Sequence, residues 1–177
     1  NITAKSITPL TDTDTLSYPR GAIVVKDDIY FADYRNHCVR KIDPNGVIKD
    51  IAGICGSGGY SGDGTQANSS QLFYPSSVVV DSNGDMFIAD SGHHVIRTVS
   101  SDGIIKSVAG IPGEGGFSGN DIDVWSAHLY EPTALAIAPN EKELYFSDHR
   151  NHCVRKIIWD DNIIKSVAGQ CGKSGFD

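Results

Sequence analysis

NHCVRKI stands at Asn36–Ile42 and again, unchanged, at Asn151–Ile157. A divergent copy, HHVIRTV, lies between them at His93–Val99. Each copy is preceded by a proline that opens an apolar run and is followed by an Ala-Gly pair. The prolines stand at positions 19, 75 and 132, so they are 56 and then 57 residues apart. A fixed period of this size predicts a modular array in which one structural unit is built three times.

Each repeat contains four short apolar segments separated by turn residues. In the first repeat the segments are 22–25, 29–32, 38–42 and 47–52, and the second repeat places Asn-Gly and Asp-Gly at its turns. Both dipeptides tolerate the positive φ angles of tight hairpins. Short strands joined by tight turns run antiparallel. We therefore predict an all-β chain of four-stranded antiparallel units, the pattern of β-propeller blades.

The segment after the second strand of each repeat resembles the NHL-repeat family, which is named for its Asn-His-Leu signature. The signature reads Asn36-His37-Cys38, Gly92-His93-His94-Val95 and Asn151-His152-Cys153. The proline before the first strand, the aspartate ending the second, the arginine in the third and the Ala-Gly ending the fourth also match. The resemblance covers about residues 18–177 and implies NHL-type propeller blades, three per chain.

The repeat boundaries divide the chain into one array with four parts. Residues 1–18 are expected to be a connector from a preceding blade, 19–74 blade 1, 75–131 blade 2 and 132–177 blade 3. The long connectors 56–64 and 113–119 are glycine-rich. Tyr60 and Phe117 stand in these connectors, and Phe176 stands in the matching segment after the third Ala-Gly. We expect these aromatic residues to fill the gap between neighbouring blades.

Closed propellers contain about four to eight blades, so three blades do not complete one. The chain starts at nearly the same point of the repeat cycle at which it stops. Three arrangements are open: an excerpt of a longer propeller, two copies completing a ring, or head-to-tail copies forming a filament, since a heterologous contact need not close. In each of them the predicted partner is protein, through self-association or other propeller blades.

The four cysteines could form disulfides in three ways. Repeats one and three have a cysteine at the signature and another just after the Ala-Gly, whereas repeat two has Val95 and Pro112 at those places. Because both cysteines are present or absent together, we predict the pairs Cys38–Cys55 and Cys153–Cys171. The rival interpretation is a zinc site with a neighbouring histidine, although the spacing does not match a zinc finger. Disulfides indicate an oxidising, extracellular compartment, secreted or at the cell surface.

Charge and composition limit the classes of partner further. A net charge of -7 argues against nucleic acid, which requires clustered Lys and Arg. No apolar stretch is long enough to predict membrane insertion. The sequons Asn1-Ile2-Thr3 and Asn68-Ser69-Ser70 predict N-linked glycans at Asn1 and Asn68.

The repeated charged residues are interpreted as structural. An aspartate ends the second strand of each repeat and an arginine follows seven positions later: Asp33 and Arg40, Asp90 and Arg97, Asp148 and Arg155. Recurrence in every repeat favours a charge-assisted hydrogen bond that holds a loop. For the same reason the signature histidines are expected to hydrogen-bond a neighbouring strand. We predict no catalytic residue, metal ligand or cofactor.

The sequence thus predicts a non-catalytic, extracellular structural and interaction module, disulfide-tied and glycosylated, within a larger assembly. The alternative is a propeller-type lyase or hydrolase with a metal on the central axis. The resemblance includes an amidating lyase of that kind, whose zinc is held by histidines from several blades.

Overall fold

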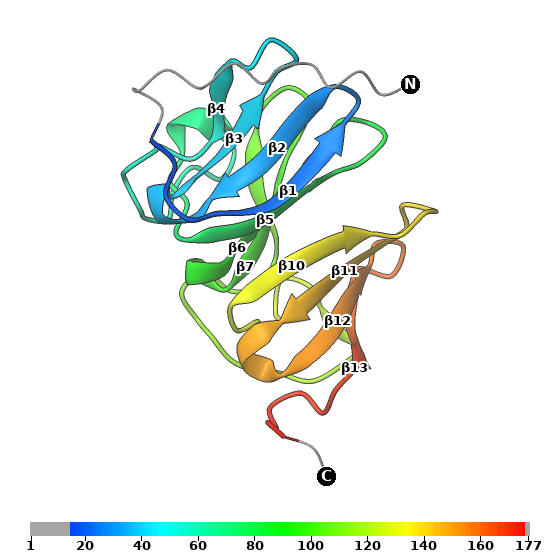
Figure 1. Ribbon diagram of the computed structural model, residues 1–177. Coiled ribbons are helices and arrows are strands. Elements are labelled where there is room, and N and C mark those ends of the chain that lie inside the picture. The colour runs from blue at the N-terminus through cyan, green and yellow to red at the C-terminus, as the bar shows by residue number, and fades with distance from the viewer. Residues whose placement is uncertain (1–14, 176–177) are drawn as a thin grey trace.

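Three antiparallel sheets, one per repeat, make up the computed structural model, which describes residues 15–175 (Figure 1). The first sheet has the strand order β1-β2-β3-β4 and the second β5-β6-β7-β8, while the third adds β9 to β10-β11-β12-β13. The strands of the first two sheets are β1 (Pro19–Val25), β2 (Asp28–Asp33), β3 (Cys38–Ile42), β4 (Ile48–Ala52), β5 (Pro75–Val80), β6 (Met86–Asp90), β7 (Val95–Val99) and β8 (Ile105–Ala109). Those of the third are β9 (Ile122–Asp123), β10 (Pro132–Ile137), β11 (Glu143–Asp148), β12 (Cys153–Ile158) and β13 (Ile163–Ala168). The blades of four antiparallel strands expected from the sequence are confirmed.

Two details of the strands differ from expectation. The first strand of each sheet begins at the proline itself rather than at the apolar run, because residues 19 and 20 still pair with β2 beyond a register shift. The third sheet has a fifth strand, β9, which comes from the preceding connector and pairs with β13. The connector before the second sheet forms no such strand. Beside the outer strand of that sheet it makes only an isolated bridge, between Gln66 and Ile104.

The hydrophobic core lies between the sheets. The first strands β1, β5 and β10 lie side by side where the three sheets meet (Figure 1). One buried cluster joins the first sheet to the second and includes Val39, Ala52, Val78 and Ile105. The other joins the second to the third and includes Ile96, Ala109, Leu144 and Ile157. Each sheet therefore buries apolar side chains against the sheet or sheets beside it.

The loop between the second and third strands has the same form in all three sheets. A single 3-10 turn, η1 (Tyr34–Asn36), η3 (Ser91–His93) or η4 (His149–Asn151), ends at a left-handed histidine. These histidines, His37, His94 and His152, have φ angles of 59°, 61° and 57°. The glycine that ends the fourth strand packs against this turn: a Cβ on Gly53, Gly110 or Gly169 would lie 2.5 Å from the histidine carbonyl oxygen. The Ala-Gly pair of each repeat is explained by this close approach.

Candidate interaction surfaces

The repeated aspartates hold the chain segment that enters each sheet. The backbone N–H groups of Ser17, Phe73 and Tyr130 each donate to an aspartate Oδ1 at 2.7 Å, in the order Asp33, Asp90 and Asp148. The signature asparagines support two of these carboxylates: Asn36 and Asn151 donate from Nδ2 to Oδ2 at 2.8 and 2.9 Å. All three aspartates are completely buried. These contacts give the aspartates an architectural role.

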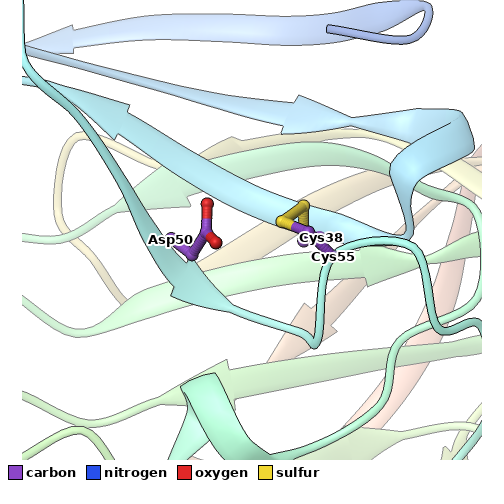
Figure 2. A group of neighbouring side chains, drawn as sticks. All are labelled: Cys38, Asp50 and Cys55. Carbon is purple, nitrogen blue, oxygen red and sulfur yellow. A yellow bond between two sulfur atoms is a disulfide. The ribbon is translucent and has the colours of Figure 1, made fainter. Parts of the chain in front are cut away.

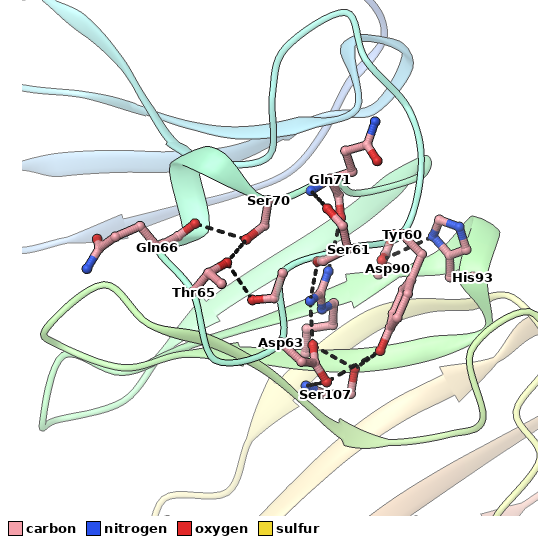
Figure 3. Close-up of polar contacts among 12 residues, drawn as sticks. Tyr60, Ser61, Asp63, Thr65, Gln66, Ser70, Gln71, Asp90, His93 and Ser107 are labelled. Carbon is pink, nitrogen blue, oxygen red and sulfur yellow. Dashed lines mark hydrogen bonds and ion pairs between the residues drawn. The ribbon is translucent and has the colours of Figure 1, made fainter.

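The second sheet departs from this pattern because His93 replaces the asparagine. His93 Nδ1 lies 3.4 Å from Asp90 Oδ2, and its ring meets the Tyr60 ring edge-on. Burial raises the pKa of Asp90 above its ordinary value. Figure 3 shows this pair beside the connector residues that pack over it.

The signature histidines connect one sheet to the next. His37 Nδ1 accepts the N–H of Tyr74 at 3.1 Å, and His94 Nδ1 accepts the N–H of Glu131 at 3.2 Å. Burial lowers the pKa of both imidazoles, which keeps Nδ1 unprotonated and able to accept. At these two positions Nδ1 is therefore already engaged, and only Nε2 could bind a metal.

The repeated arginines bind the preceding connector. Arg97 donates to the carbonyl oxygens of Gln71 and Ser61 at 3.0 and 2.9 Å, and Arg155 donates to those of His128 and Gly119 at 3.1 and 2.6 Å. Each guanidinium also lies over the connector aromatic: the centroid distances are 4.8 Å to Tyr60 and 5.1 Å to Phe117. Phe176, the third aromatic named from the sequence, lies outside the described residues.

The carboxylate partner of the arginine differs among the repeats. Arg155 Nη1 pairs with Asp148 Oδ2 at 3.1 Å, and Arg40 lies 3.5 Å from Asp33 and 2.8 Å from Asp50. Arg97 pairs with Asp63 of the connector instead of with Asp90. Asp63 also accepts the N–H of Ser107, a role that Asn120 has toward Ser166 in the third sheet (Figure 3). Sequence reasoning missed these connector residues, although the matching Gly-Asp and Gly-Asn steps were a usable signal.

Two disulfides, Cys38–Cys55 and Cys153–Cys171, tie the third strand of the outer sheets to the connector that follows. Asp50 lies beside the first of them (Figure 2). Together they form the one group of three metal-ligand side chains found in residues 15–175, but both sulfurs are bonded to each other.

Of the predicted glycosylation sites, Asn68 is exposed on η2 (Ala67–Ser69), in the connector before the second sheet. Asn1 lies outside the described residues.

A groove of about 680 Å³ crosses the loop ends of all three sheets. It is lined by Arg20 and Tyr34 of the first sheet, His94 of the second, and Glu131 and Arg150 near the third. Glu131 pairs with Arg150 at 2.9 Å, and the Arg20 guanidinium lies 3.7 Å from the Tyr34 ring centre. We call this surface the loop-face groove. It combines aromatic and arginine side chains, which are enriched at the energetic centres of protein interfaces.

The outer faces of the first and third sheets are the second candidate surface. A smaller hollow of about 350 Å³ on the first sheet is lined by apolar residues that include Leu16, Ala22 and Ile29. On the third sheet Val154 and Val167 are exposed. Within residues 15–175, no helix is long and apolar enough to cross a membrane.

Comparisons with known proteins agree with this architecture. The family model described as the teneurin NHL domain matches residues 55–176. NHL repeat-containing protein 2 of Gallus gallus is 36% identical over 109 residues, which is 61% of this chain and 14% of that protein. Teneurin-4 of Homo sapiens is 28% identical over 168 residues, which is 84% of this chain and 6% of that protein. The chain thus spans a small part of the curated relatives it matches.

Solved structures share the fold at low sequence identity. A gluconolactonase from Xanthomonas campestris superposes with a TM-score of 0.63 at 13% identity, covering 88% of this chain and 48% of that chain. A chain of a nidogen–laminin complex has a TM-score of 0.60 at 15% identity, covering 86% of this chain and 49% of that chain.

Proposed function

Because the chain belongs to the teneurin NHL domain family, we propose that it is a non-catalytic module that binds other proteins. The observation that carries the proposal is the loop-face groove, to which loops of all three sheets contribute. The repeated polar residues are used in fixing those loops. The groove itself is lined by half-buried tyrosines and exposed arginines, side chains suited to recognition.

The chemistry of the groove favours a protein partner. Tyr34 and Tyr74 offer flat amphipathic surfaces, and Arg150 and Glu131 offer both charges within one ion pair. Aromatic side chains bury a large area at a low cost in conformational entropy. A partner segment with both apolar and polar groups fits such a surface.

We place the module in an oxidising compartment, secreted or at the cell surface. The two disulfides support this assignment, since reducing compartments keep thiols free. The exposed Asn68 would carry an N-linked glycan there. Asn68 is not among the residues that line the loop-face groove.

We also propose that the module works within a larger assembly. Three sheets leave two blade faces without a neighbour among the described residues, and both faces carry apolar side chains. Further blades, whether from the same polypeptide or from another copy, would cover them.

The enzyme alternative is distinguished by metal content. A propeller-type lyase or hydrolase with an axial metal requires a stoichiometric zinc or calcium bound by His37, His94 or His152. Plasma mass spectrometry of the purified protein measures this directly. A bound equivalent that is lost on substituting His152 would favour the enzyme over the interaction module.

Affinity capture tests the proposed binding. The immobilised protein is incubated with solubilised cell-surface proteins, alongside Tyr34→Ala and Arg150→Ala variants in the groove. Lys106→Ala, an exposed change on β8, is the matched control. We expect a discrete set of proteins that the wild type and the control retain and that the groove variants lose. Equal capture by all four proteins would contradict a role for the groove.

A further inference from the structure

The three repeats share one backbone frame at their loop ends but carry different side chains on it. Before each proline stands Tyr18, Tyr74 or Glu131, with left-handed φ angles of 55°, 51° and 51°. The turn after the second strand begins with Tyr34-Arg35, Ser91-Gly92 or His149-Arg150. Residues common to all repeats maintain the frame, whereas residues that differ at one place of the frame are available for recognition. Strained left-handed positions cluster at functional sites.

The loop-face groove is open where the second repeat carries small side chains. Ser91 and Gly92 line the groove in the second sheet, whereas the third sheet has the larger His149 and Arg150 at the same two places. A Cβ on Gly92 would lie 2.5 Å from the ring of Phe73, so no larger residue fits there. Because the second sheet packs between the other two, the groove lies across boundaries between neighbouring sheets that are both present.

An aromatic strip crosses the boundary between the first and second sheets. The ring centroids of Tyr34 and Tyr74 are 5.0 Å apart, and those of Tyr74 and Phe73 are 4.5 Å apart. All three residues line the groove and are half-buried, so each ring is held by its neighbours and still has an open part. An apolar side chain of a partner can pack on this strip at a low cost in conformational entropy.

Arg20 supplies a positive charge that the other repeats lack, since its counterparts are Ser76 and Thr133. It is exposed, and its guanidinium lies over the Tyr34 ring, 3.7 Å from the ring centre. Among residues 15–175 it has no ion pair and no side-chain hydrogen bond. A guanidinium that lies on a ring keeps its N–H edge available for a planar acceptor, and a carboxylate can take two hydrogen bonds from it.

The other charges of the groove are balanced. Arg150 pairs with Glu131 at 2.9 Å, and His149 Nδ1 lies 3.7 Å from the same carboxylate. The positive charge of Arg20 is therefore left over, although the chain as a whole has a net charge of -7. We propose that the loop-face groove binds an acidic peptide segment of a partner protein. This proposal rests on the proposed function and names the chemistry of the partner.

In the proposed complex, an Asp or Glu carboxylate of the partner binds Arg20, and a neighbouring apolar side chain packs on Tyr34 and Tyr74. An acidic glycan would meet the same arginine. It has dense negative charge and no apolar side chain, so it would leave the aromatic strip unused and would be repelled by Glu131. The chemistry of the groove therefore favours a peptide over a glycan.

Selection of random peptides displayed on phage, with the 177-residue chain immobilised, tests the proposal. The variants are Arg20→Gln, which removes the charge, and Arg20→Glu, which reverses it. Lys106→Gln is the matched control, since it removes an exposed positive charge on β8, away from the groove. Arg20 is exposed, so both variants are expected to fold, which circular dichroism checks.

We expect the wild type and Lys106→Gln to enrich peptides in which Asp or Glu neighbours an apolar residue. Arg20→Gln should lose this enrichment, and Arg20→Glu should enrich Lys or Arg instead. A synthetic peptide of the selected sequence, followed by fluorescence anisotropy, should bind Arg20→Gln about 10-fold or more weakly than wild type. Replacing its acidic residue by the corresponding amide should weaken binding to the wild type by a similar factor.

Two results would overturn the acidic peptide as partner: selection without acidic enrichment, or an enrichment that Arg20→Gln retains. Heparin provides the glycan arm, and heparin that binds more tightly than the selected peptide and depends on Arg20 would also overturn it. The proposed function fails separately. Proteins whose capture is lost in Tyr34→Ala but unchanged in Arg20→Gln would leave the groove a protein-binding site without a preference for acidic partners.

Discussion

Arg155 Nη1 lies 3.1 Å from Asp148 Oδ2, and both side chains are completely buried. The same guanidinium donates to two carbonyl oxygens of the connector. The pair therefore joins three elements: β11, β12 and the chain that arrives from the second sheet. Burial raises the pKa of Asp148, so the carboxylate depends on these neighbours to remain charged.

Replacing Arg155 should be strongly destabilising. Arg155→Met leaves Asp148 buried without its cation and frees the connector carbonyls, so we expect a loss of about 3–5 kcal/mol in the free energy of unfolding. Urea denaturation measures it. The control is Lys142→Met, which removes the exposed ion pair with Asp160 and should cost at most about 1 kcal/mol. Equal effects of the two changes would show that the buried pair has no special role.

Removing the first disulfide should lower stability without changing the sheet order. Cys38→Ser with Cys55→Ser opens a link between residues 17 apart, which in the chain-entropy model stabilises by about 3 kcal/mol. Chemical denaturation under non-reducing conditions gives the difference. Intact-mass measurement with and without reductant provides the control, since native protein with four free thiols would contradict the pairing.

Protonation of His37 and His94 should lower the stability of the protein in mild acid. Their pKa values in the folded protein are lowered, so their contribution is present above the ordinary histidine pKa near 6.5 and is lost as the pH falls through the lowered value. His94→Asn keeps a side chain that tolerates left-handed φ but does not titrate between pH 7 and 5.

The measurement is the melting temperature of wild type and His94→Asn at several pH values. Asp90 and Asp148 have raised pKa values, so their contribution to the stability of the fold has the opposite sign and decreases as the pH rises. The informative quantity is therefore the difference in melting temperature between wild type and His94→Asn at each pH. We expect the variant to lose less stability than the wild type between pH 7 and 5. Parallel curves would rule out His94 as a source of the acid sensitivity.

Expression through a secretory pathway should attach a glycan to Asn68. The side chain is exposed on η2, and the sequon is completed by Ser70. Mass spectrometry before and after glycosidase treatment, with Asn68→Gln as the comparison, detects it. An unchanged peptide mass for the wild type would show that the sequon is unused.

The sequence predicted the sheets because the information for them is local and repeated. The alternation of apolar runs and turn residues located all four strands of each blade, and the paired absence of cysteines in repeat two identified the cysteines that bond. It did not predict β9, because two residues of a connector become a strand only when β13 lies beside them.

The sequence did not predict the ion-pair partners of the charged residues, for a similar reason. Asp90 and Arg97 have the same spacing as Asp148 and Arg155, yet Arg97 pairs with Asp63. Asp63 approaches Arg97 only because its connector crosses the outer strand of the second sheet, a contact between residues 34 positions apart.

By itself, then, the sequence determined that this chain is three copies of one blade, since backbone pairing within a blade depends on neighbouring segments. The tertiary structure alone decided which copies of a repeated residue are covered. Val39 and Val154 stand at the same place in identical heptapeptides, yet one is fully buried and the other is 38% exposed. The difference arises because burial of a blade face depends on the blade packed against it, which is remote in the chain or belongs to another molecule.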